Sequence, residues 1–209
     1  MPRRPREEEA GAIHHVYARG IDRRALFVDD VDRWRYLALL EHVVGVAAWR
    51  CLSYCLMGNH VHLMIETPVP NLGKGMQVLH GDFGRDVNIR HDRSGHVFQG
   101  RFGSKRLRTE SHLWTTAAYI AANPVEAGMC PTPEAWPWAS HRMAAARGPA
   151  PLWLDSPRLF ELFTPLGGDP RQRYCELVRD RCATRAWVAA ERRALAGRAP
   201  GAGGAALAA

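Results

Sequence analysis

The sequence has 209 residues, of which 46% are hydrophobic, so the chain is long and apolar enough to bury a core. Its 28 Lys and Arg residues outnumber its 21 Asp and Glu residues, and this basic balance favours a polyanionic partner such as nucleic acid. Five cysteines without paired spacing argue against a secreted disulfide scaffold, and the absence of a long apolar run argues against a membrane partner. We therefore expect a cytoplasmic protein.

Along the chain, strands and helices are predicted to alternate. We expect strands at 13–20, 49–57, 60–67 and within 95–108, and helices at 29–47, 71–91 and from 109 or 111 to 123. The apolar stripe expected of the first helix has helical spacing and comprises Val31, Trp34, Leu37 and Val44. Gly58 and Asn59 predict a tight turn between the second and third strands. Pro124 limits the last of these helices.

The order β-α-β-β-α-β is the split βαβ arrangement of a ferredoxin-like sandwich. We therefore predict an α+β fold with an antiparallel sheet, two helices on one face and the other face free, followed by a C-terminal helical extension. The expected boundaries are a flexible charged arm at 1–12, a main domain at 13–145, the helical extension at 146–195 and a disordered low-complexity tail at 196–209.

The third predicted strand carries two imidazoles, at His60 and His62, in a segment that could be wholly apolar. Strand side chains alternate, so Val61 faces the helices and the two histidines face the other side of the sheet. Their Cα atoms would be about 6.6 Å apart, close enough for both rings to reach one metal ion. Structural histidines satisfied by hydrogen bonds would give the same pattern, so both interpretations stand.

A zinc site using Cys51 and Cys55 is a competing hypothesis. On a strand these residues would be about 13 Å apart, too far to share an ion through bonds of about 2.3 Å. We expect core or incidental thiols at Cys51, Cys55, Cys130, Cys175 and Cys182.

The helix after residue 109 has an apolar stripe that includes Ala117 and Ile120, and it leaves Tyr119 and Asn123 on a different face. These two residues are one turn apart and therefore neighbours. A phenol beside an amide is also an ordinary surface arrangement. Opposite two histidines, the same pair would supply a nucleophile and a further metal ligand.

Four segments, "GNHVHLMI", "RSGHVFQGRF", "YIAANPVEAG" and "WPWASHR", resemble the HUH single-tyrosine transposases, in particular the REP-associated tyrosine transposase (RAYT) branch. His60, Val61 and His62 match the histidine, hydrophobic residue, histidine motif for which the family is named. The resemblance covers roughly residues 13–143 and becomes looser in the helical C-terminal part.

The resemblance implies a metal-dependent DNA transposase, an endonuclease and strand transferase that cleaves and rejoins hairpin-bearing single-stranded DNA through a 5′-phosphotyrosine intermediate. Tyr119 would be the nucleophile, and His60, His62 and Asn123 would hold Mg²⁺ or Mn²⁺. Paired transesterifications conserve the phosphodiester energy, so no nucleotide cofactor is expected. The protein would act at the nucleoid, as a monomer or a homodimer.

A basic and aromatic stretch around the fourth strand predicts the DNA surface. The expected DNA-binding residues are Arg101, Lys105, Arg106, Arg108, Arg3 and Arg4. Phe98 and Phe102 would stack on bases or belong to the core. The arm carrying Arg3 and Arg4 could equally be solvated, and "WPWASHR" is expected to dock the chain onto the domain.

The sequence departs from its relatives in two places. Ala118 stands where they often have a basic residue, and glycines from Gly73 to Gly84 interrupt the second helix. These departures bear on how tightly DNA is held and on whether that helix is continuous.

Two rival hypotheses stay open: a non-catalytic binder of structured single-stranded DNA, and a small metallohydrolase in which His60 and His62 activate water.

Overall fold

The structure is a computed structural model that describes residues 8–146 and 150–196. Its sheet has four strands in the order β2-β3-β1-β4, and each neighbouring pair is antiparallel. The strands are β1 (Ala12–Arg19), β2 (Arg50–Leu56), β3 (His60–Thr67) and β4 (Gly103–Leu107). This order confirms the predicted α+β fold with a split βαβ pattern and an antiparallel sheet. The arm residues Arg3 and Arg4 and the tail at 197–209 lie outside the described residues.

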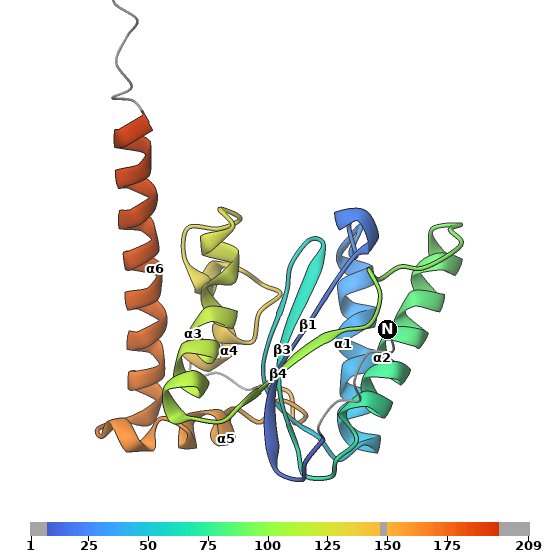
Figure 1. The fold of residues 1–209 in the computed structure, drawn as a ribbon, viewed down its shortest axis with the longest axis horizontal. Coiled ribbons are helices and arrows are strands. Elements are labelled where there is room, and N and C mark those ends of the chain that lie inside the picture. The colour runs from blue at the N-terminus through green and yellow to red at the C-terminus, as the bar shows by residue number, and fades with distance from the viewer. Residues whose placement is uncertain (1–7, 147–149, 197–209) are drawn as a thin grey trace, which may run out of the picture.

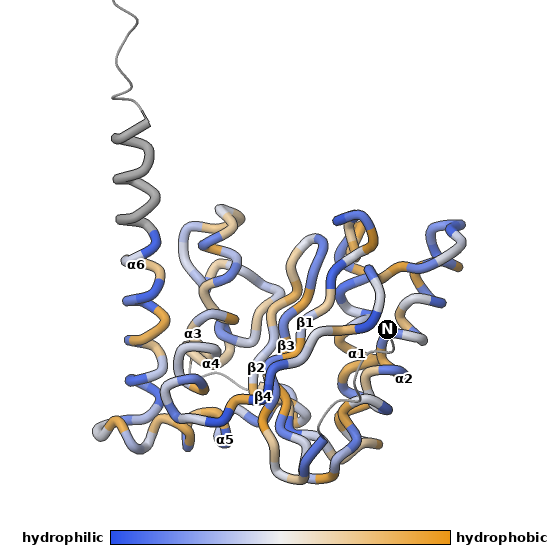
Figure 2. Tube along the Cα trace, viewed as in Figure 1, coloured by the Kyte–Doolittle hydropathy of each residue, from blue (hydrophilic) through white to orange (hydrophobic). Residues whose placement is uncertain are grey.

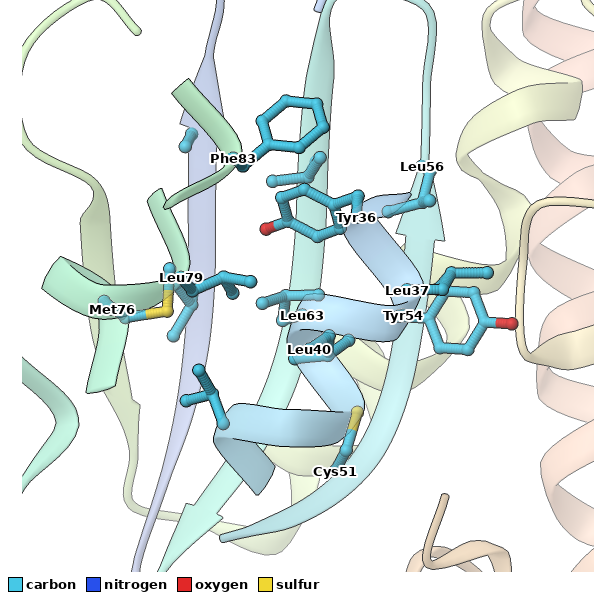
Figure 3. Close-up of a cluster of buried hydrophobic side chains, with 14 of the residues drawn as sticks. Tyr36, Leu37, Leu40, Cys51, Tyr54, Leu56, Leu63, Met76, Leu79 and Phe83 are labelled. Atoms are coloured by element: carbon cyan, nitrogen blue, oxygen red, sulfur yellow. The ribbon is translucent and has the colours of Figure 1, made fainter. Parts of the chain in front are cut away.

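Two helices cover one face of the sheet, as Figure 1 shows: α1 (Asp30–Val46) and α2 (Leu72–Arg90). Asp29 caps α1, because its side chain accepts a hydrogen bond from the backbone N–H of Asp32. A buried cluster of aliphatic and aromatic side chains fills the space between the helices and the sheet (Figure 3). In it, Tyr36 and Leu40 from α1 meet Leu63 from β3, which confirms the expected facing of the apolar residues in that strand.

The expected apolar stripe of α1 is correct at Leu37 and Val44, which are each 7% exposed, and wrong at Val31 and Trp34, which are 48% and 64% exposed. The face of α1 that packs towards the sheet is centred on the buried residues Tyr36, Leu40 and Val43. Trp34 instead lies with its ring edge against Trp138, with the two ring centroids 5.1 Å apart. Apolar spacing alone did not distinguish the two possible faces.

The helix α2 is continuous in spite of its glycines, and one of them has a packing role. Gly75 lies against the buried indole of Trp49, where a Cβ would come within 2.2 Å of the ring. The indole cannot move aside easily, because its N–H donates to Asn71 Oδ1 at 2.7 Å. Gly81, by contrast, has no atom within 4 Å of the position its Cβ would take.

The second face of the sheet is covered, so the expectation of a free face is wrong. The helix α3 (Glu110–Glu126) packs there through Ala117, Ile120 and Ala121, against Met64 and Leu107. Figure 1 shows α3 on the opposite side of the sheet from α1 and α2. The two layers of helices make the sheet the middle layer of the molecule.

The helix α3 also runs past Pro124, where the sequence predicted its end. Proline removes one backbone donor and leaves those of the following residues intact. The next turn therefore forms: Ala127 N donates to Asn123 O at 2.9 Å, and Gly128 N donates to Val125 O at 2.9 Å. Gly128, with a φ of 71°, then ends the helix in the left-handed region.

The C-terminal part adds further helices, of which α6 packs on the side of α3 away from the sheet (Figure 1). The helices of this part are α4 (His141–Ala146), α5 (Ser156–Glu161) and α6 (Pro170–Ala196). Short 3-10 helices also occur at Ile21–Arg23, Pro133–Ala135 and Thr164–Leu166. Figure 2 shows hydrophobic and hydrophilic residues alternating along α6. Its buried residues Tyr174 and Val178 join the cluster beneath α3. The predicted helical extension is therefore packed against the domain.

The segment "WPWASHR" pairs with the outer edge of β2, as its docking role predicted. Leu56 N donates to Trp138 O at 2.9 Å, and Ser140 N donates to Tyr54 O at 3.0 Å. The indole N–H of Trp136 also donates to Leu56 O, at 3.0 Å. None of the helices in the described residues is long and apolar enough to span a membrane.

A Gly75→Ala variant is expected to lose about 1–3 kcal/mol of unfolding free energy, because the new methyl group overpacks the Trp49 indole. Gly81→Ala in the same helix is expected to gain about 0.5–1 kcal/mol, since alanine favours the helix and meets no neighbour. Urea unfolding of both variants and of wild type measures the difference. Equal effects at the two positions would contradict the packing described.

Candidate active site

The histidine pair lies at the start of β3, on the face that α3 covers. His62 is 7% exposed and His60 is partly buried, with ring centroids 5.1 Å apart. Both line an open cavity of about 270 Å³ whose other walls include Tyr17 and Arg101. The pair is therefore reachable from solvent on one side and packed on the other.

The helix α3 brings Tyr119 and Asn123 to this pair. Thr109 caps the start of the helix, because its side chain accepts a hydrogen bond from His112 N. With the apolar stripe of α3 packed on the sheet, Tyr119 and Asn123 lie beside the start of β3. The Tyr119 ring centroid lies 5.2 Å from that of His62. The Asn123 side chain is 7% exposed and forms a hydrogen bond with His60. Four residues that the sequence singled out thus converge in one place.

The imidazoles of the pair are held in their neutral forms. Burial lowers the pKa of His60, although the hydrogen bond to Asn123 acts in the opposite direction. Burial lowers the pKa of His62 further, and the neighbouring His15 and His60 add to that effect. A neutral imidazole offers a lone pair, which is the form that binds a metal ion.

The orientation of His60 is set by Asn59 in the turn before β3. The Asn59 amide nitrogen donates to Arg23 O at 3.0 Å, so its oxygen turns to His60 Nδ1 at 2.8 Å. Because that oxygen only accepts, His60 Nδ1 carries the proton and its Nε2 keeps a lone pair, which Asn123 or a metal ion can contact.

The donor set fits a divalent ion. His62 Nε2 is buried without a hydrogen-bond partner among the described residues, which is costly unless something binds there. Within the described ranges, no three His, Cys, Asp or Glu residues form a metal-binding group. A site here would therefore rely on an amide, and two imidazoles with the amide oxygen of Asn123 suit Mn²⁺ or Mg²⁺.

Sequence reasoning missed His15 on β1. Its Nε2 lies 3.0 Å from His62 Nδ1, and its ring centroid is 5.8 Å from that of Tyr119. Burial lowers the pKa of His15 to about 4, with the charges of Lys105 and His112 as smaller causes. The adjacent letters "HH" in the first strand were the available signal, but only the pairing of β1 with β3 reveals which neighbour His15 meets.

Arg181 on α6 was also missed. Its guanidinium lies over the Tyr119 ring, 5.0 Å from the centroid, and its Nε is 2.6 Å from Glu126 Oε1. A cation over an aromatic face attracts the ring and restrains it. The C-terminal extension therefore contacts the tyrosine directly, and no local pattern in the sequence signals a contact between residues so far apart.

The predicted basic residues around β4 divide between the two faces. Arg101 lines the cavity beside the histidines, and Lys105 pairs with His15 in the β1–β4 register, on the same face. Arg106 points to the other face, where it forms an ion pair with Glu9. Arg108 is exposed just after the strand.

The two phenylalanines whose role the sequence left open belong to the core. Phe98 and Phe102 are 9% and 7% exposed and lie beside His80, whose ring stacks on Phe98 at 4.0 Å. Cys51 and Cys55 are free and buried in the two separate clusters, because the β2–β3 register shifts between Cys51 and Ser53. These two thiols cannot share one ion.

Comparisons with known proteins identify the family of the chain. Residues 10–123, more than half of the chain, match the family described as "Transposase IS200 like". The chain belongs to the IS200-like transposase family. No curated protein sequence matches it.

One solved structure similar to this chain is a REP-associated tyrosine transposase bound to a REP hairpin. The two share 18% sequence identity and superpose with a TM-score of 0.61, over 72% of this chain and 89% of the other. This likeness shows a shared fold, and it agrees with the resemblance that the four sequence segments carry.

The protein is expected to lose stability as the pH falls below 6.5, at pH values higher than those at which carboxylates titrate. Burial lowers the pKa of several histidines: His14, His15, His60, His62, His80 and His141. A histidine whose folded pKa is lowered binds a proton more readily when unfolded, so its stabilising effect is present above pH 6.5 and is lost below it.

The free energy of unfolding should therefore fall from pH 7.5 to pH 5, with a slope that corresponds to uptake of more than one proton on unfolding. Urea titrations at half-unit pH intervals measure that slope. A flat profile across this range would contradict the neutral, buried state of these imidazoles.

Proposed function

We propose that this protein is a metal-dependent DNA strand transferase that cleaves and rejoins single-stranded DNA bearing a hairpin, with Tyr119 as its nucleophile. The observation that carries the proposal is the approach of the Tyr119 ring to His62, with Asn123 hydrogen bonded to His60. Membership of the IS200-like transposase family supports it. The solved relative bound to a REP hairpin supports a hairpin as the DNA partner.

In the proposed reaction, the Tyr119 oxygen attacks the scissile phosphorus and the bond from phosphorus to the 3′ oxygen breaks. The phenol loses its proton, the released 3′ oxygen gains one, and the DNA 5′ end stays attached as a phosphotyrosine. A second 3′-hydroxyl then reverses the same steps and restores the phenol. One phosphodiester is exchanged for another, so the reaction needs no nucleotide cofactor.

His60, His62 and Asn123 would hold Mg²⁺ or Mn²⁺, which supplies Lewis-acid stabilisation of the charge that develops on the phosphate. A phenol has a pKa of about 10 and is a weak nucleophile at neutral pH, so it depends on such help. Arg101 and Lys105, on the face of the site, are proposed to contact DNA phosphates, with Arg106, Arg108, Arg3 and Arg4 as further contacts.

The same geometry supports use of the tyrosine in cis. Tyr119 lies beside the histidines of its own chain, and Arg181 of its own α6 covers the ring. A catalytic site completed within one chain needs no second copy. We therefore propose that a monomer is competent for cleavage.

A denaturing gel for a covalent adduct tests the nucleophile. The chain is incubated with Mg²⁺ or Mn²⁺ and hairpin-bearing single-stranded DNA from repeats that flank the gene. Wild type is expected to form an adduct, whereas Tyr119→Phe and His62→Ala form none. Tyr17→Phe is the matched control, since Tyr17 is an exposed phenol whose ring lies 6.5 Å from His62 and should be dispensable.

Each other outcome points to a rival. Cleavage that persists in Tyr119→Phe would favour a metallohydrolase in which water is the nucleophile. Binding of several flanking repeats with no cleavage would favour a non-catalytic DNA binder. Loss of the adduct in Tyr17→Phe but not in Tyr119→Phe would reassign the nucleophile.

Arg181→Ala is expected to slow adduct formation about 3- to 10-fold in single-turnover assays, because the Tyr119 ring loses the cation that restrains it. Arg185→Ala is the control: Arg185 reaches the same Glu126, at 3.7 Å, but the guanidinium that lies over the Tyr119 ring is that of Arg181. An equal rate loss in both variants would assign the effect to Glu126 and not to the ring.

A further inference from the structure

The contact between His15 and His62 joins two groups that can each either donate or accept. His15 Nε2 and His62 Nδ1 are 3.0 Å apart, so one of the two nitrogens carries the proton between them. The choice decides the state of the opposite nitrogen on His62. If Nδ1 of a neutral imidazole accepts, then Nε2 carries a proton; if Nδ1 donates, then Nε2 keeps a free lone pair.

The surroundings of His62 favour the second arrangement. Its Nε2 is buried and meets no acceptor in the part of the chain that the structure describes. A proton on that atom would be a buried donor without an acceptor, which is unfavourable. A bare lone pair on the same atom is the ligand that a divalent ion requires.

His60 gives an independent reason, because its tautomer is already determined. Its Nδ1 donates to Asn59 Oδ1, and that amide is held in place by its own bond to Arg23 O. Its Nε2 is therefore the bare nitrogen. A metal ligand on His62 likewise needs a bare nitrogen, and among the described residues the hydrogen-bonding partner of its Nδ1 is His15 Nε2, at 3.0 Å.

We infer that His15 is a positioning residue for His62: its Nε2 accepts a hydrogen bond from His62 Nδ1–H and so holds His62 in the tautomer whose Nε2 is free for a metal ion. The inference rests on the proposed function in one respect, namely that His62 is a ligand of the divalent ion. Partners of this kind orient the ring and raise the basicity of the ligating nitrogen.

The strand register explains why β1 supplies this partner. Tyr17 lies directly opposite His62 in the β1–β3 pairing, and His15 is two residues further along the same face, opposite Met64. Diagonal neighbours on one face of an antiparallel pair are within reach of long side chains. The His15 ring crosses this diagonal, with its centroid 5.2 Å from that of His62.

The tautomer can be measured directly in the metal-free chain. Nitrogen-15 NMR of histidine-labelled protein separates protonated from bare ring nitrogens, and a His62→Gln variant assigns the His62 signals. We expect His62 to be protonated at Nδ1 and bare at Nε2 in wild type. A His62 signal with its proton on Nε2 would overturn the inference, whatever the protein does to DNA.

Mn²⁺ affinity provides the second test, by titration calorimetry of the full chain with Mn²⁺ alone. His15→Leu, which cannot accept a hydrogen bond, is expected to weaken Mn²⁺ binding about 10- to 100-fold. His15→Gln is the matched variant, because its amide oxygen lies near the position of the imidazole Nε2 and accepts in its place. Its affinity should stay within about threefold of wild type.

The outcomes separate the inference from the proposed function. Wild type that binds Mn²⁺ no better than His62→Ala would refute the metal site, while the tautomer measurement would still decide the role of His15. Wild-type affinity retained by His15→Leu would overturn the inference and leave the metal site standing. If His15→Leu fails to fold, the wild-type tautomer and the His15→Gln variant decide.

Discussion

The candidate site depends on the antiparallel pairing of β1 with β3 at the centre of the sheet. That register sets Tyr17 opposite His62 and His15 on the diagonal, and it leaves the other face of both strands to the main core. A shift by one residue would turn every one of these imidazoles into the apolar cluster beneath α1 and α2. Because Val61, Leu63 and Ile65 must be buried beneath α1 and α2, the histidines of the site lie on the opposite face of the sheet.

The helix α3 covers one side of this polar stripe and leaves the other side open as a cavity. Its small apolar residues allow a close approach to the sheet, and its other flank then carries Tyr119 and Asn123 to the histidines. Burial has an electrostatic result as well, since it keeps the imidazoles neutral and their lone pairs available. The position of α3 therefore both places Tyr119 and Asn123 beside the histidines and contributes to the burial that keeps the imidazoles neutral.

Sequence reasoning anticipated what depends on short-range periodicity and on motif. The succession of strands and helices along the chain, the facing of His60 and His62 away from the core and the one-turn spacing of Tyr119 and Asn123 all follow from residues close in the chain. His15 and Arg181 could not be anticipated in the same way, because their partners are 47 and 62 residues distant from them in sequence. The burial of Trp34 was predicted wrongly because helical spacing did not distinguish the face of α1 that meets the sheet from the face that carries Trp34 to Trp138.

The strap of main chain from Trp138 to Ser140 has a consequence for assembly. By bonding to Tyr54 and Leu56 it occupies the open backbone groups along the outer side of β2, which an approaching strand from another molecule would need. Among the described strands, the remaining border of the sheet is the five-residue β4, which is short and carries Lys105 and Arg106. Two copies brought together edge to edge there would each present Lys105 on a short edge, while Arg106 stays paired with Glu9, and such an edge disfavours extension of the sheet.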